Sequence, residues 1–317
     1  MAAKEQSRLR LFFDSDLVYS FKRSPLAIIA TLVTLISFAV AALAPVIAPH
    51  CVEPVCLDLM NGLTPPAWTE YGDPSFPLGT DEQGRDILSS IFYAARVSLV
   101  VGFAAVGFGM VLGVALGVIA GYFGGWIDAL IMRLADMQLT FPSILVALLI
   151  AGVVRSIITD LADRGILTGV AFEDVAIFVL IVAIGLSDWP RFARVARGAT
   201  LVELNKGYVA AAKVLGLPAR RIMLHHVLPN LMGPILVIAT IGLALAVIAE
   251  ATLSFLGVGV PPTNPSLGTL IRIGNEYLFS GEWWITLFPA LGLVMLVLSV
   301  NIIGDWLRDA LNPKLRR

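Results

Sequence analysis

Few side chains in this sequence are spaced for covalent or metal chemistry. His225 and His226 are adjacent, whereas the zinc-binding histidines of an H-E-x-x-H helix stand at i and i+4, and the chain has neither that motif nor a Cys/His cluster. It also lacks a G-x-x-x-x-G-K-[ST] loop, which cradles nucleotide phosphates. The sequence therefore predicts no metal site and no catalytic residue, and any ATP-driven work needs a partner.

Glu250 is the ionisable residue that stands out. It sits well inside a long apolar run, with no basic residue within two helical turns. A carboxyl group in such a place avoids lipid, so it faces another subunit or a water-filled cavity, or it is a buried and hydrogen-bonded structural group. We take Glu250 as a candidate for a translocation path and keep the structural carboxyl as the alternative.

Composition indicates the environment in which these residues work. Of the 317 residues, 58% are hydrophobic and 14% are charged, whereas soluble domains have about 45–50% apolar and about 25% charged residues. The net charge is -1, which gives no overall basic field for nucleic acid. The excess of apolar residues predicts an integral membrane protein.

Six apolar stretches are long enough, or nearly so, to cross a bilayer as helices, which takes about 20 residues. A lipid-exposed backbone must satisfy its own hydrogen bonds, and no alternating barrel strands are visible. We therefore predict an all-α polytopic protein, in which the fourth helix extends past Pro190 to reach full length. The six predicted spans are residues 26–47, 97–123, 129–154, 175–189, 232–256 and 285–303.

The distribution of Lys and Arg predicts the orientation. Five basic residues precede the first span, whereas residues 48–84 contain none and carry six Asp or Glu residues. Because basic segments stay on the cytoplasmic side, residues 1–25 are predicted to be cytoplasmic and residues 48–94 to form an extracytoplasmic loop. Six spans return the chain to the cytoplasm, where the tail of residues 307–317 is again basic.

The two cysteines lie close together in the predicted extracytoplasmic loop. Cys51 and Cys56 form a small disulfide if that segment faces an oxidising compartment. Two free thiols are the equal alternative.

Small and charged residues also mark predicted helix contacts. A glycine recurs every four residues in the second span, at Gly109, Gly113, Gly117 and Gly121, and such a smooth face lets another backbone approach closely. Arg133 and Asp136 are close enough in sequence to pair on one helix face. Arg191, Arg194 and Arg197 fall at a cytoplasmic helix end, where snorkelling and orientation explain them, and we assign them no transport role.

The segment between the fourth and fifth spans is the most informative. Its alanine run predicts a helix, Gly216 and Pro218 end that helix, and a second short helix runs from about Ala219 to near Pro229. Such a segment can lie across the cytoplasmic face. The spacing alone favours the alternative, an ordinary loop with an interfacial helix.

This segment resembles the coupling loop of bacterial ABC importer permeases, EAA-x3-G-x9-I-x-L-P, in the variant of the oligopeptide, dipeptide and nickel branch. Ala211-Ala212, Gly216 and His226-x-Leu228-Pro229-Asn230 match it, whereas Ala210 replaces the signature glutamate. The resemblance implies a coupling loop at residues 203–230 that keeps the helix–glycine–helix shape of the signature. The alanine at position 210 removes the charge contact that the signature glutamate would make. The ATPase-coupling residues that it implies are Tyr208, Ala211, Ala212, Gly216, Arg221, His226, Leu228 and Pro229.

Further stretches resemble the C-type subunit of the same branch. They include Pro77-Leu78-Gly79-Thr80-Asp81 with Gly84-Arg85-Asp86, then Ala95-Arg96-Val97-Ser98-Leu99, and later Leu253-Ser254-Phe255-Leu256-Gly257 and Asn301-Ile302-Ile303-Gly304-Asp305. The resemblance covers nearly the whole chain from the first span onward. It implies the type I ABC importer permease fold, with its transmembrane domain at residues 95–306.

The family implies a transport subunit of the bacterial inner membrane rather than an enzyme. It would form half of a pathway for dipeptides or oligopeptides, beside a second homologous permease, two ABC ATPases and an extracytoplasmic solute-binding protein. No cofactor is expected on this chain, because ATP and Mg²⁺ would bind the ATPases. Nickel complexes, glutathione and peptide-like antibiotics remain alternative solutes, and an ion-coupled secondary transporter or a membrane scaffold remain rival classes.

Overall fold

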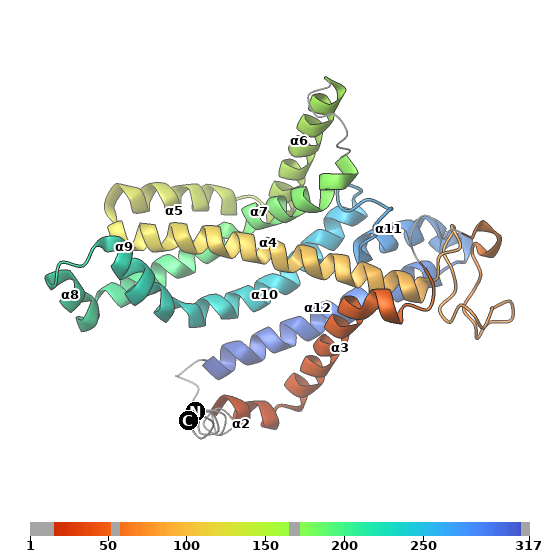
Figure 1. The fold of residues 1–317 in the computed structure, drawn as a ribbon, viewed down its shortest axis with the longest axis horizontal. Coiled ribbons are helices and arrows are strands. Elements are labelled where there is room, and N and C mark those ends of the chain that lie inside the picture. Colours follow the sequence, from red (N-terminus) through yellow and green to blue (C-terminus); the bar gives the residue numbers. More distant parts are fainter. Residues whose placement is uncertain (1–15, 52–57, 165–171, 312–317) are drawn as a thin grey trace.

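The computed structural model describes residues 16–51, 58–164 and 172–311. The described chain is helical and contains no β-strand, which confirms the predicted all-α class (Figure 1). Its α-helices are α2 (Asp16–Arg23), α3 (Pro25–Ile47), α4 (Ile87–Phe123), α5 (Gly125–Leu139), α6 (Ser143–Asp163), α7 (Phe172–Leu204), α8 (Gly207–Val214), α9 (Ala219–Ile222), α10 (Leu228–Phe255), α11 (Leu267–Tyr277) and α12 (Trp284–Leu311).

Six helical segments of the described chain are long and apolar enough to cross a membrane, as predicted. They are Pro25–Ile47, Ile87–Phe123, Ser143–Asp163, Val175–Leu204, Ala219–Phe255 and Trp284–Ala310. The fourth span runs unbroken through Pro190, which confirms its predicted extension. Long helices of this kind satisfy their own backbone groups, as lipid requires.

The predicted third span is wrong in its bounds. Residues 129–154 do not form one helix, because α5 ends at Leu139 and α6 begins at Ser143. Pro142 lacks an N–H donor and its ring excludes a regular helix through the preceding residues. As a result α5 lies beside α4, whereas α6 projects away from the bundle (Figure 1).

The second span begins earlier than predicted. Its helix, α4, starts at Ile87, where the Asp86 carboxylate accepts the backbone N–H of Ser89 at 3.0 Å as an N-cap. At about 1.5 Å per residue, this helix is about 55 Å long. The predicted boundary between the loop and the domain, at residue 95, therefore falls inside α4.

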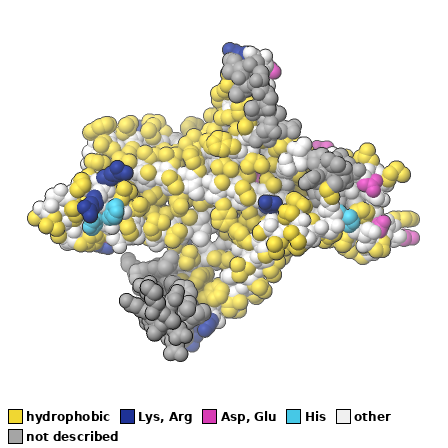
Figure 2. Space-filling model, in the orientation of Figure 1, with side chains coloured by type: hydrophobic (Ala, Val, Ile, Leu, Met, Phe, Trp, Pro, Cys, Tyr) yellow, Lys and Arg dark blue, Asp and Glu magenta, His cyan; other side chains and the backbone are white. Residues whose placement is uncertain are grey.

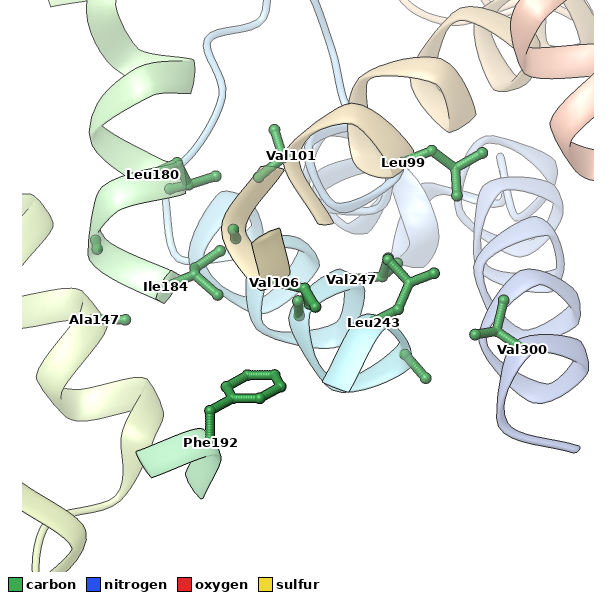
Figure 3. Packing of buried hydrophobic residues seen from close by; sticks show 14 of the residues in the cluster. Leu99, Val101, Val106, Ala147, Leu180, Ile184, Phe192, Leu243, Val247 and Val300 are labelled. Carbon is green, nitrogen blue, oxygen red and sulfur yellow. The ribbon is translucent and has the colours of Figure 1, made fainter. Parts of the chain in front are cut away.

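The apolar core lies where α4, α7 and α10 meet. Figure 3 shows Leu99, Val101 and Val106 of α4 near Leu180 and Ile184 of α7 and Leu243 and Val247 of α10. The helices α3 and α12 cover another side of α4 (Figure 1). Residues 58–86 and α11 lie at one end of the bundle, and α8 and α9 lie at the other, so the bundle has two distinct ends.

Candidate functional site

Residues 203–230, which we call the coupling segment, begin with a helix that ends at a glycine. After α8, the N–H of Gly216 donates to the Lys213 carbonyl at 3.0 Å, and the N–H of Leu217 donates to the Ala212 carbonyl at 3.2 Å. These two bonds define a Schellman motif, and Gly216 has the positive φ of 73° that the motif needs. For an L-residue that conformation costs about 1–2 kcal/mol. The predicted helix break at Gly216 is present.

The second part of the coupling segment differs from the prediction. The helix that starts at Ala219 does not end near Pro229, because a π-helical turn, Met223–Val227, joins α9 directly to α10. In a regular helix the ring of Pro229 would collide with the carbonyl of residue 225. The wider turn, in which the Leu228 N–H bonds to the Met223 carbonyl, accommodates the proline.

A hydrogen-bond network around Tyr208 fixes α8 to the spans on either side. The Tyr208 hydroxyl donates to the Glu203 carboxylate at the end of α7, and Asn230 Nδ2 of α10 donates to the same hydroxyl at 3.0 Å. The bond to Glu203 raises the pKa of the Tyr208 phenol. Lys206 Nζ also contacts Glu203, at 2.5 Å. Glu203 is not among the predicted coupling residues, although the nearby Lys206 and Tyr208 were a signal for its role.

The two faces of the coupling segment differ in exposure. Val209, Ala212, Ile222 and Val227 are buried against the bundle, whereas Val214 and Leu215 are 88% and 78% exposed. Lys213, Arg220 and Arg221 are also exposed. Figure 2 shows Lys, Arg and His side chains gathered at this end of the molecule beside hydrophobic surface. The outer face is therefore an apolar and basic surface suited to docking another protein.

The predicted coupling residues divide between these faces. Ala212 is buried and packs the segment onto the bundle, so it is not a contact for another protein. Tyr208 is partly exposed, and its hydroxyl is used inside the chain. The remaining residues are exposed or partly exposed: Ala211, Gly216, Arg221, His226, Leu228 and Pro229.

Charged and amide side chains join α5 to α7. Arg197 pairs with both carboxylate oxygens of Asp128, at 2.5 and 2.6 Å, and Arg194 pairs with Asp136 at 2.6 Å. The expected pairing of Asp136 with Arg133 is therefore wrong. Because Arg194 and Arg197 hold one helix against another, they do more than orient the chain. Gln138 adds a hydrogen bond from the Trp189 indole N–H at 2.8 Å.

The glycine stripe of α4 lies directly against α7. A Cβ placed on Gly113 would come within 2.4 Å of the Trp189 carbonyl oxygen, and one on Gly117 within 2.3 Å of the Ala193 carbonyl oxygen. Gly109 faces Gly185 and Gly121 faces Thr200 in the same way. The close helix contact that the stripe predicts is thus present. It makes α4 and α7 one unit, to whose end the coupling segment is attached.

Glu250 is the clear correction to the predicted site. It is 0% exposed, and Ser98 of α4 and Ser254 of α10 each donate a hydrogen bond to its carboxylate at 2.7 Å. The hypothesis that Glu250 faces a translocation path is therefore wrong for this chain. Glu250 is the structural carboxyl of the alternative interpretation, because each of its oxygens is paired inside the helix bundle.

The cysteine prediction stays open. Cys51 is described and is not a free thiol. Cys56 lies outside the described residues, so the pairing of these two cysteines remains a prediction.

The fold and the coupling segment together define a class of protein. In the part of the chain that the structure describes, six segments long and apolar enough to span a membrane form one bundle, and the coupling segment presents an exposed apolar and basic surface at one end, which is the class of a polytopic membrane protein. The chain belongs to the family of binding-protein-dependent transport system inner membrane components, whose model matches residues 113–317. The resemblance to ABC importer permeases is confirmed, and the chain is a multi-pass inner-membrane transport subunit rather than an enzyme.

Curated relatives match most of the chain. The Di/tripeptide transport system permease protein DppC of Pseudomonas aeruginosa is 36% identical over 87% of this chain and 84% of its own length. The Dipeptide transport system permease protein DppC of Escherichia coli K12 is 38% identical over 94% of this chain and 92% of its own length. The protein of the same name from Bacillus subtilis is 34% identical over 99% of this chain and 90% of its own length.

A solved structure supports the fold. A chain of the MetNI methionine ABC transporter, in an inward-facing conformation, superimposes with a TM-score of 0.53 over 71% of this chain and 98% of its own length. The two sequences are 19% identical. At that level the likeness extends to the fold alone, and it confirms the predicted ABC importer permease fold.

Proposed function

We propose that this chain is one of two permease subunits of an ABC importer and that its solute is a dipeptide or short oligopeptide. The observation that carries the solute class is the identity of 34–38% to permeases of dipeptide and di/tripeptide transport systems, along nearly their full length. Nickel complexes, glutathione and peptide-like antibiotics are the alternative solutes.

The two ends of the bundle and α6 support the proposed partners. Two ABC ATPases, which bind ATP and Mg²⁺, dock on the coupling segments, and a solute-binding protein docks at the end formed by residues 58–86 and α11. A second homologous permease completes the pathway. It accounts for α6, whose Leu145, Leu149, Val153 and Ile157 are all at least half exposed on a helix that projects from the bundle.

Motion of an ATPase would reach the pathway through rigid connections. The Tyr208 hydroxyl joins α8 to α7 through Glu203 and to α10 through Asn230. The glycine stripe then joins α7 to α4. Movement of α8 would thus displace three spans together, and alternating access by rigid-body motion needs such a packed unit rather than a flexible loop.

The reconstituted complex tests the proposal. In proteoliposomes that contain both permeases and both ATPases, with the binding protein outside, we expect ATP-dependent uptake of a labelled dipeptide. Gly216→Val should lower this uptake about tenfold, because a β-branched residue at a positive φ of 73° disrupts the end of α8. The amount of inserted permease should stay at the wild-type level, since no atom lies within 4 Å of an added Cβ.

Gly216→Asn is the matched variant. Asparagine adopts left-handed backbone angles more readily than other L-residues, so this variant should keep most of the uptake and of the copurifying ATPase. Equal uptake by Gly216→Val and the wild type would refute the coupling role. Uptake of a nickel complex but of no peptide would replace the proposed solute.

We further propose that both termini and the coupling segment are cytoplasmic and that residues 48–86 are extracytoplasmic. The Lys and Arg asymmetry supports this orientation. After mild reduction of intact spheroplasts, a membrane-impermeant thiol reagent should label Cys51 and Cys56, whereas a cysteine in Leu215→Cys should react only after lysis. The reverse labelling pattern would invert the topology.

A further inference from the structure

A groove with almost purely apolar walls lies beside the coupling segment, between α4 and α10. It has a volume of about 470 Å³. Val114 and Ala115 of α4, Leu224 of the π-helical turn and Met232 of α10 line it together with other aliphatic side chains. Arg220 of α9 is the one charged residue of this lining. The groove therefore offers apolar walls with a single cation.

Arg220, the cation of the groove, belongs to a group of three basic residues that make no ion pair within the described chain, although Lys213 Nζ lies 5.8 Å from the centroid of the Tyr122 ring. Lys213, Arg220 and Arg221 are exposed, and none of them pairs with an Asp or Glu of the described chain. By contrast, Arg194 and Arg197 on α7 both pair with α5 carboxylates. The charge next to the groove is thus available to an anion from outside the chain.

We propose that this groove binds an anionic phospholipid, with one acyl chain between α4 and α10 and the phosphate at Arg220. Both walls belong to helices that are long and apolar enough to span the membrane, so acyl chains of the bilayer can reach a groove between them. Basic pockets between spans on the cytoplasmic side bind anionic headgroups. A peptide is a poor occupant, because apolar walls would leave its backbone groups without hydrogen-bond partners.

The bound lipid would pack against the side of the coupling segment that faces the membrane-spanning helices. It would contact α4, α9 and α10 at once, filling the space under the π-helical turn that carries α9 onto α10. The site rests on the proposed cytoplasmic placement of the coupling segment. Its test needs neither solute nor ATP turnover, so its failure is distinguishable from failure of the proposed function.

Lipid retention by the whole importer is the measurement. The detergent-purified complex would be incorporated into bilayers of phosphatidylcholine mixed with phosphatidylglycerol, re-extracted, and examined by mass spectrometry of the intact complex. We expect retention of phosphatidylglycerol by the wild type and about fivefold less by Arg220→Gln, since one Lys or Arg near anionic lipid contributes about that factor. Arg221→Gln, the adjacent cation outside the groove lining, is the matched control and should retain phosphatidylglycerol.

A second variant separates the acyl chain from the headgroup. Ala115→Trp fills the groove from an exposed position on α4 and leaves Arg220 in place, so it should also lower the retention of phosphatidylglycerol. Equal loss in Arg220→Gln and Arg221→Gln would overturn the specific site in favour of a diffuse basic surface. Retention by Ala115→Trp at the wild-type level would exclude the groove.

Cross-linking identifies the occupant directly. A photoreactive amino acid at position 115 should add the mass of a phospholipid to this chain. A cross-link to the second permease instead would show that a protein helix fills the groove, and it would overturn the proposal.

Discussion

Gly117→Val is expected to prevent the chain from accumulating as a folded membrane protein. A Cβ at position 117 would lie 2.3 Å from the Ala193 carbonyl oxygen and 2.8 Å from the Ala196 Cβ, so α4 and α7 would have to separate. Extra methyl groups in a packed core cost about 1–3 kcal/mol, and more where the obstacle is backbone. The measurement is the yield of monodisperse protein after detergent extraction, with its thermal unfolding midpoint.

Gly107→Val on the same helix is the control. No atom lies within 4 Å of an added Cβ at Gly107, so the same substitution should leave yield and unfolding midpoint close to the wild type. If the Gly117→Val protein accumulates and unfolds like the Gly107→Val protein, the close packing of α4 on α7 is refuted. An isolated membrane helix accepts valine equally well at position 107 or 117. A difference in yield or unfolding midpoint between the two variants therefore reports on the packing of α4 against α7.

The number of spans and the glycine contact were predictable because each depends on local sequence. An apolar run of sufficient length must become a helix in lipid, wherever the rest of the chain lies. Four glycines at four-residue intervals form one face of a helix by geometry. The sequence does not name the partner of that face, however, and α7 became known only from the structure.

Prolines show why helix bounds were harder to predict. Pro142 separates two helices, Pro229 is accommodated by the π-helical turn that precedes it, and Pro190 lies inside an unbroken span. All three remove a backbone donor and add the same ring. Their outcomes differ because tertiary packing decides whether the neighbouring helical segments stay aligned, and that packing is not encoded near the proline.

The site residues that sequence analysis misread have distant partners. Asp136 pairs with Arg194, 58 positions away, rather than with its neighbour Arg133. Ser98, which donates to Glu250, is 152 positions from it. A single sequence gives the spacing within one helix but not which helices meet. For Asp136 the available inference was therefore a pairing with a neighbour in sequence, and for Glu250 it was a position facing a water-filled cavity.

Glu250→Ala is expected to destabilise the permease rather than to impair the pathway. Ser98 and Ser254 both donate to the carboxylate, and their hydroxyls in turn accept the N–H groups of Leu267 at 3.3 Å and Val260 at 3.1 Å. Glu250 therefore ties α4 and α10 to the start of α11. Truncation leaves a cavity and two buried hydroxyls without their acceptor, at a cost of about 2–5 kcal/mol.

Glu250→Gln distinguishes this structural role from a role in the translocation path. The amide has nearly the same shape, and its carbonyl oxygen still accepts one of the two hydroxyl groups, so yield and unfolding midpoint should fall less than in Glu250→Ala. Dipeptide uptake, normalised to the amount of assembled complex, should match the wild type for Glu250→Gln, because the side chain is fully buried within the chain. A Glu250→Gln complex that assembles in normal amounts but transports poorly would contradict the structural role and return Glu250 to the translocation path.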